Sequence, residues 1–155
     1  MTPLLGDLIP IPNIDEREQE MLRKVDSVMQ ELAGETAARD LHGRYPKDAI
    51  ATLAQTGIFK TAIGQGEDGA HGYSQRFSLE AQLRLASVDS SIAQIFKVHD
   101  ELLREMIGYG SPGQIQRLQG LVFDEEAIIG LAVAEAGRTA AEPMQTMCER
   151  ADADT

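Results

Sequence analysis

The chain has 155 residues, with 14 Lys plus Arg against 25 Asp plus Glu, and a formal net charge of −11. A domain of this length buries roughly 70% of the surface of its unfolded chain, so a sizeable core is expected. Hydrophobic residues make up 43% of the chain, which excludes wholesale disorder. The acidic balance argues against a nucleic-acid binder, because few Lys or Arg side chains are available to release counterions from phosphates.

The sequence also lacks signals for export, membrane insertion and thiolate metal binding. Cys148 is the single cysteine, which excludes an internal disulfide and a multi-thiolate metal site. Residues 1–12 contain no Lys or Arg and therefore lack the basic start of a secretory signal. The longest apolar stretch, residues 127–134, is far shorter than the roughly 20 residues that span a bilayer. We therefore expect a soluble cytoplasmic protein with no membrane association and no metal site.

The first part of the chain predicts an extended lead-in followed by a long helix. Residues 1–14 contain three prolines and show no helical period. Asp15 then opens an acidic first turn, which suits the positive end of a helix, and the helix is expected to end near Leu41. Its apolar positions recur with the 3.6-residue period of a helix and are Met21, Leu22, Val25, Val28, Met29, Leu32 and Ala33.

Proline and glycine mark the next elements. Pro46 suits the first position of a second helix, and Gly57 suits its C-terminal stop. Residues 64–72 contain four glycines and are predicted to form a loop. A third helix is predicted over residues 74–86.

Two further helices are predicted in the second half. One begins at Asp89 or Ser90, both of which are good N-caps, and ends at the glycines of residues 108–110. Residues 111–114 combine a capping box with a proline at the first helical position, which predicts a short fifth helix. We therefore expect a mainly α fold with a helical bundle domain over residues 15–126.

The glycine loop matches a nucleotide-binding motif in sequence, but its neighbouring residues do not fit such a site. Residues 64–69 match G-x-G-x-x-G, but a dinucleotide site needs these glycines between a strand and the start of a helix. Glu67 and Asp68 stand where a phosphate would have to approach, and His71 prolongs the loop. The pattern therefore favours a turn between helices.

His99 is the titratable residue with the most informative position. It lies on the apolar face of the fourth predicted helix, with Phe96, Leu102 and Leu103. Burial there would shift its pKa, which is one route to a general acid or base. A core histidine that hydrogen-bonds to a neighbouring element gives the same pattern, and the spacing alone favours that second interpretation. Asp100 is predicted to belong to the hydrated face of the helix.

The end of the chain has a different character. Residues 127–134 form a continuous short apolar run between acidic residues and Gly137, which favours a strand buried on both faces. Such a strand needs hydrogen-bonding neighbours, and only residues 144–148 offer a weak candidate. We therefore expect residues 127–155 to be the start of a middle β-domain that is cut short.

A series of short motifs runs in order along most of the chain. They are Tyr45-Pro46, Leu53-Ala54, Gly57-Ile58-Phe59, the loop of residues 64–72, Glu80, residues 89–94, His99, Gly110, Gln114 and residues 130–135. In this order, over residues 14–137, they resemble the N-terminal region of the acyl-CoA dehydrogenase superfamily.

The resemblance implies a larger enzyme around this chain. In the superfamily, a helical N-terminal domain packs on a middle β-domain, and a C-terminal four-helix domain follows. FAD or FMN binds between the last two domains, and the enzymes are usually homotetramers. The strand predicted here falls where the β-domain begins, so Leu131, Val133 and Ala134 correspond to positions that touch the flavin. The catalytic glutamate of a dehydrogenase would lie outside this chain.

Two branches of the superfamily are compatible with the residues. Acyl-CoA dehydrogenases usually carry T-E-P-x-A-G-S-D after the strand, and here Ala134 replaces the threonine that contacts the flavin. The run from Asp89 to His99 resembles the reduced-flavin monooxygenases, which include dibenzothiophene and sulfone desulfurisation enzymes. That likeness implies His99 as a proton donor or acceptor, a flavin reductase as partner, and a small organic substrate, with sulfur compounds as one such class.

We therefore expect the N-terminal part of a reduced-flavin monooxygenase, and two alternatives stay open. The first is an acyl-CoA dehydrogenase that oxidises an acyl thioester with FAD. The second is a non-catalytic helical interaction module, because a helix face that meets a partner gives the same periodicity.

Overall fold

The computed structural model describes residues 14–65, 72–131, 139, 141–143 and 145–147. These residues contain α2 (Glu16–Leu41), α3 (Lys47–Ala54), the 3₁₀ turn η1 (Ile58–Lys60), α4 (Gln75–Val88), α5 (Ser90–Tyr109) and α6 (Pro112–Phe123). The predicted mainly α fold is therefore confirmed for the described residues. In the described part of the chain there is no strand; residues 128–131 of the predicted strand have no ladder partner, and residues 132–134 lie outside the described residues.

The long helix α2 begins and ends where its sequence predicts. The Asp15 side chain accepts the Glu18 amide at 2.8 Å, and the Glu18 carboxylate accepts the Asp15 amide at 3.3 Å, which completes a capping box. The Glu18 carboxylate is also buried and accepts the amide of Ser74, at the start of α4, at 2.6 Å. One side chain thus joins the starts of two helices.

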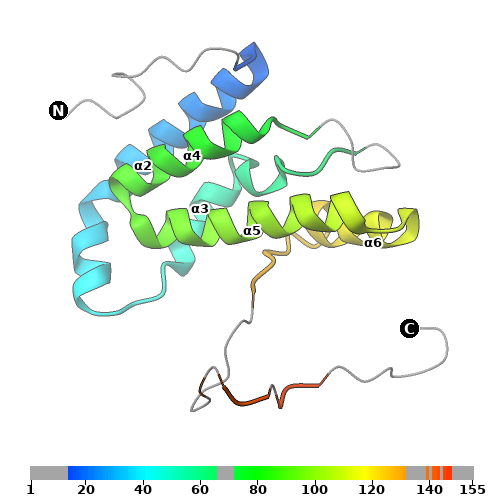
Figure 1. Cartoon of the computed structure of the whole chain (residues 1–155). Helices are drawn as coiled ribbons and strands as arrows, with labels where there is room; N and C mark the ends of the chain where they lie inside the picture. The colour runs from blue at the N-terminus through cyan, green and yellow to red at the C-terminus, as the bar shows by residue number, and fades with distance from the viewer. Residues whose placement is uncertain (1–13, 66–71, 132–138, 140, 144, 148–155) are drawn as a thin grey trace.

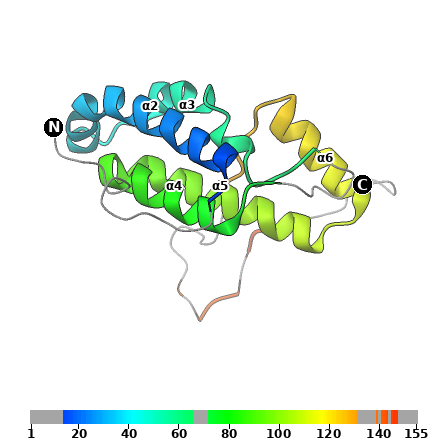
Figure 2. The same ribbon diagram turned by 90° about the horizontal axis from the view of Figure 1, so that it is seen from above.

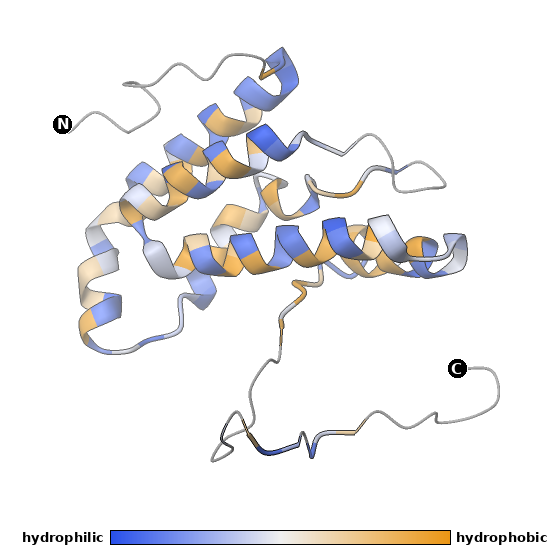
Figure 3. Ribbon diagram, viewed as in Figure 1, coloured by the Kyte–Doolittle hydropathy of each residue, from blue (hydrophilic) through white to orange (hydrophobic). Residues whose placement is uncertain are grey.

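Three helices form the main body of the domain. In Figures 1 and 2, α2 and α4 lie side by side, and α5 packs against α4. Their inward faces are the apolar ones, as the colouring in Figure 3 shows. The largest fully buried side chains of this core are Phe77, Phe96, Met29, Leu53, Ile58, Leu85, Ile92 and Val25. Ala33, the last position of the predicted stripe of α2, is exposed.

A second apolar cluster holds the other end of α5. It joins the residues after η1 to α5 and α6 and consists of Ala62, Ile63, Leu103, Leu118 and Val122. Ile129, in the segment that follows α6, packs against it. This cluster therefore fixes where the chain leaves the helical domain.

The predicted helix boundaries are correct to within two residues. Pro46 is the N-cap of α3 instead of its first residue. The helix α4 extends beyond residue 86 to Val88, because the Asp89 amide still donates to the Leu85 carbonyl at 2.8 Å. Asp89 then caps α5, and its side chain accepts the amides of Ser91 and Ile92.

The described ends of the glycine loop lie against each other. The Tyr73 amide donates to the Thr61 carbonyl at 2.7 Å, and a Cβ on Gly72 would lie 2.5 Å from the Ala62 carbonyl oxygen. The residues before the loop form the turn η1, and α4 begins only at Gln75, so the strand and helix that a dinucleotide loop requires do not flank it. Residues 66–71 lie outside the described residues.

No helix among the described residues is long and apolar enough to cross a membrane.

Candidate functional site

The structure places His99 at a junction of three segments. Its side chain lies on α5 and is 1% exposed. Its Nε2 atom lies 2.7 Å from the Phe59 carbonyl oxygen of η1, and its Nδ1 atom accepts the Ile129 amide at 2.9 Å. The Phe59 ring also packs edge-on against the imidazole, with centroids 5.7 Å apart. His99 thus connects α5 to η1 and to the segment after α6.

These two bonds determine the protonation state of the ring. The Ile129 amide can only donate, so Nδ1 must carry no proton. A proton on Nε2 then donates to the Phe59 carbonyl, which is an acceptor only. Burial lowers the pKa of His99 below its ordinary value of 6.5, against the opposing effects of the Phe59 carbonyl and the Asp100 carboxylate. The histidine is therefore held neutral.

The predicted flavin-contacting positions lie just beyond this junction. Leu131 is two residues after Ile129 and is 60% exposed. Val133 and Ala134 lie outside the described residues. The structure thus brings His99 together with the segment that leads to these positions, although the roles predicted for all four residues stay predictions.

A groove lies between this segment and α5. A cavity of about 310 Å³ is lined by Tyr45, Gln94, Ile95, Val98, Ile128, Ile129 and Gly130. A volume near 300 Å³ is at the lower end of what small-molecule sites occupy. Its walls are largely apolar, and Ile128 remains 37% exposed.

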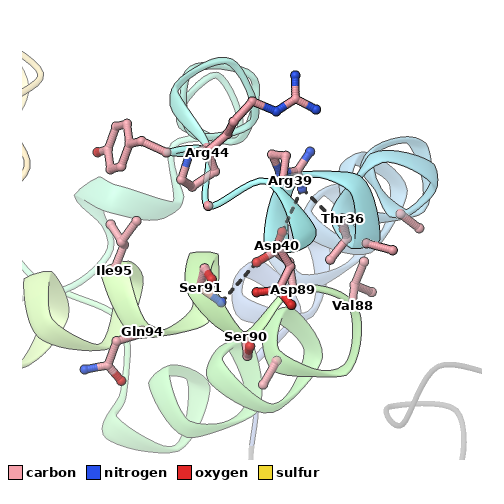
Figure 4. A pocket seen from close by; sticks show the side chains of 16 residues that line it. Thr36, Arg39, Asp40, Arg44, Val88, Asp89, Ser90, Ser91, Gln94 and Ile95 are labelled. Atoms are coloured by element: carbon pink, nitrogen blue, oxygen red, sulfur yellow. Dashed lines mark hydrogen bonds and ion pairs between the residues drawn. The ribbon is translucent and has the colours of Figure 1, made fainter.

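A larger cavity shares part of this lining. It measures about 1100 Å³ and meets the smaller cavity at Tyr45, Gln94 and Ile95. Figure 4 shows how the end of α2 and the start of α5 face each other across it, with Arg39 and Asp89 joined in its wall. The start of α5 is therefore bordered by a long, mostly open depression.

The Arg39–Asp89 ion pair belongs to that wall, which Asp40 and Arg44 also line. The Arg39 guanidinium donates to Asp89 Oδ2 at 2.7 Å and to Thr36 Oγ1 at 3.3 Å. Burial alone would raise the pKa of Asp89, but the Arg39 hydrogen bond and the Ile92 amide outweigh it, so that this pKa is lowered. Asp89 thus stays ionised and cannot serve as a proton donor near neutral pH.

The comparisons with known proteins identify the family. Residues 15–125, most of the chain, match the family described as acyl-CoA dehydrogenase, N-terminal domain. The chain belongs to this family. No significant match was found among curated proteins or among solved structures.

The acyl-CoA dehydrogenase family generally binds FAD, so the described residues can be tested for their fit to a flavin. Ile128 and Leu131 expose apolar surface on the segment after α6. Between them, nothing lies within 4 Å of the position that a Cβ on Gly130 would occupy. An exposed apolar segment with open backbone fits the flat face of an isoalloxazine ring. Among the described residues, no group of three or more His, Cys, Asp or Glu side chains is placed to hold a metal ion.

The prediction for Asp100 is wrong. This carboxylate is 2% exposed and does not belong to the hydrated face of α5. It accepts a hydrogen bond from the Ser78 hydroxyl of α4 and two from the Arg104 guanidinium, the latter at 2.9 and 3.2 Å. Arg104 also donates to the Tyr73 carbonyl at 3.0 Å. The i, i+4 spacing of Asp100 and Arg104 indicated the ion pair but not its burial.

Sequence reasoning also missed the lining of the groove. Tyr45, Gln94, Val98 and Ile128 come from three separate parts of the chain and share no motif. The one usable signal was that Ile95 and Val98 are apolar positions of α5 that lie beside its fully buried residues.

Proposed function

We propose that this chain forms the helical wall of the flavin and substrate site in an oxidoreductase of the acyl-CoA dehydrogenase type. The observation that supports this best is the groove at residues 128–130, which adjoins the segment that the family resemblance assigns to the flavin. The flavin would be FAD or FMN and would supply two-electron redox chemistry to a small organic substrate.

The residues of this chain would bind and orient the substrate and the flavin, and would exclude water from the site. Ile95, Val98 and Ile128 offer an apolar surface to an acyl or other hydrocarbon part of a substrate. Leu131, Val133 and Ala134 would approach the flavin through backbone groups. The resemblance implies that the catalytic base of a dehydrogenase lies outside this chain. At neutral pH, His99 is held neutral and Asp89 is held ionised.

Titration with FAD and FMN tests this proposal. The titration can be followed by the emission of the flavin itself. We expect binding to shift the amide resonances of residues 128–131, and we expect Ile128→Ser to weaken it by about fivefold through loss of apolar contact. Leu79→Ser, on the exposed face of α4, is the matched control and should leave binding unchanged. Amide shifts confined to α4, or none, would contradict the proposal.

A reduced-flavin monooxygenase is the second candidate. It is favoured by Ala134, which stands where dehydrogenases usually carry threonine, and by the run of residues 89–99. A dehydrogenase loaded with FAD would be bleached by an acyl-CoA without oxygen. A monooxygenase would instead form product only with a flavin reductase and O₂. Its substrate would be a small organic compound, with sulfur compounds as one class to test.

The assembly state is part of the same proposal. Members of the family are usually oligomeric, and we propose a homotetramer for the complete enzyme. Light scattering on the eluting protein measures this directly. A cofactor-free interaction module would give no flavin signal in any of these assays.

A further inference from the structure

The two hydrogen bonds of His99 suggest a role different from proton transfer. Both ring nitrogens already have backbone partners, at 2.7 and 2.9 Å, and the side chain is almost fully buried. A general acid or base needs a nitrogen that a substrate or a water molecule can reach. In this arrangement the ring presents no such nitrogen.

The partner on the Nδ1 side is the segment that leaves the helical domain. After α6, the Ala127 amide donates to the Leu121 carbonyl at 2.9 Å, which closes the helix end. Beyond that point, and within the described residues, the Ile129 amide makes the one hydrogen bond that links residues 128–131 to a helix. His99 therefore fixes the position of residues 128–131 along α5.

The partner on the Nε2 side is equally well anchored. The Phe59 carbonyl belongs to η1, which the left-handed Gly57 connects to α3, with a φ of 86°. Phe59 is buried and packs against both Phe96 and His99 on α5. The imidazole is thus held on its Nε2 side by a packed turn and accepts the Ile129 amide on its Nδ1 side.

We infer that His99 is a positioning residue. Its neutral, Nε2-protonated imidazole holds the Ile129 amide and thereby sets the position of Gly130 and Leu131, which face the proposed flavin. This inference rests on the proposed function for the meaning of that position, but not for the bond itself. A neutral imidazole suits the task because it donates on one edge and accepts on the other. Protonation of Nδ1 would replace the acceptor by a donor and would remove the bond to Ile129.

The tautomer can be tested in the unmodified chain. Nitrogen NMR of His99 should show a protonated Nε2 and a bare Nδ1 at neutral pH. A coupling across the hydrogen bond should connect Nδ1 to the Ile129 amide nitrogen. A protonated Nδ1, or an imidazole that exchanges freely between tautomers, would overturn the inference without any variant being made.

Two conservative variants separate the two bonds. The amide oxygen of His99→Asn occupies the place of Nδ1 and retains an acceptor, whereas the amide nitrogen of His99→Gln occupies the place of Nε2 and retains a donor. We expect the Ile129 amide to exchange with deuterium about tenfold faster in the Gln variant, because one buried hydrogen bond is lost. The Asn variant should keep the Ile129 amide protected from exchange, but it should leave the Phe59 carbonyl of η1 without its donor. His42→Asn, at an exposed turn, is the matched control.

The outcomes keep this inference apart from the proposed function. Unchanged protection of Ile129 in His99→Gln would overturn the positioning role even if flavin binds. Faster exchange in a chain that binds no flavin would uphold the bond and count against the proposed function instead. When flavin does bind, the Gln variant should also reduce the flavin-induced shifts at residues 130–131, and the Asn variant should retain them.

Discussion

The Asp89 carboxylate divides its two oxygens between two helices. Oδ2 accepts the Arg39 guanidinium of α2 at 2.7 Å, and Oδ1 accepts the amides of Ser91 and Ile92 at the start of α5. Both side chains of the ion pair are largely buried. The same residue therefore caps one helix and compensates the charge of another.

Substitution of Asp89 should separate these two contributions. Asp89→Asn retains a good N-cap but leaves the largely buried Arg39 charge with only the exposed Glu35 carboxylate, at 3.5 Å, so we expect the free energy of unfolding to fall by about 3 kcal/mol. Asp89→Ala should cost about 1 kcal/mol more, since it also removes the cap. Urea unfolding followed by circular dichroism measures both. Glu20→Ala breaks the exposed pair with Arg23 and should leave the free energy of unfolding nearly unchanged. Equal effects of the Asn variant and this control would contradict the prediction.

The buried Asp100 should be far more sensitive than its neighbour on the exposed face. Asp100→Asn removes the charge that Arg104 and the Ser78 hydroxyl face, and we expect a loss of about 2 kcal/mol in unfolding free energy. Glu101→Gln breaks an exposed pair with Lys97 and should be nearly neutral. The comparison is made by urea unfolding at neutral pH. Similar losses in both variants would show that Asp100 is not buried in solution.

The pH dependence of stability should carry a contribution from His99. Its pKa is lowered in the folded protein, so the unfolded chain takes up this proton first. The contribution is therefore complete above the ordinary value of 6.5 and is lost as the pH falls from there to the folded value. Urea midpoints measured between about pH 7.5 and 5.5 should fall, and His99→Asn should flatten that part of the curve. A wild-type curve that is flat over this range would refute the prediction.

Two glycines should respond in opposite ways to alanine. A Cβ on Gly72 would meet the Ala62 carbonyl oxygen at 2.5 Å, so Gly72→Ala must move backbone and should cost about 2 kcal/mol. Gly34 lies inside α2 with nothing within 4 Å of its Cβ position. Gly34→Ala should therefore raise stability by about 0.7 kcal/mol through helix propensity. Thermal melts of the two variants side by side check both signs.

The helices could be predicted from sequence because their signals are local. The apolar period of α2, the acidic first turn that Asp15 opens and the proline of α6 each act within a few residues, and the structure confirms them. The limit of α4 was missed by two residues because Asp89 serves as the end of one helix and the start of the next. Local sequence signals do not decide whether such a residue ends the first helix or begins the second.

The site was less predictable because its contacts are not local. His99 was recognised as a buried ionisable group, but its partners on Phe59 and Ile129 belong to elements that the period of α5 does not describe. Asp100 was misplaced for a similar reason, since its burial is imposed by Ser78 on α4 and by the position of Arg104. Periodicity identifies which face of a helix is apolar, but not which polar groups a neighbouring element covers.

The two hydrogen bonds of His99 join segments that are far apart in the sequence. Phe59 is 40 positions before His99, and Ile129 is 30 positions after it. Closing each of these loops costs entropy that the local turns of α5 do not compensate. The imidazole loses its water on burial but recovers both hydrogen bonds only when all three segments have met. Partial assembly around α5 is thus penalised, which makes the docking of η1 and of the departing segment a single cooperative event.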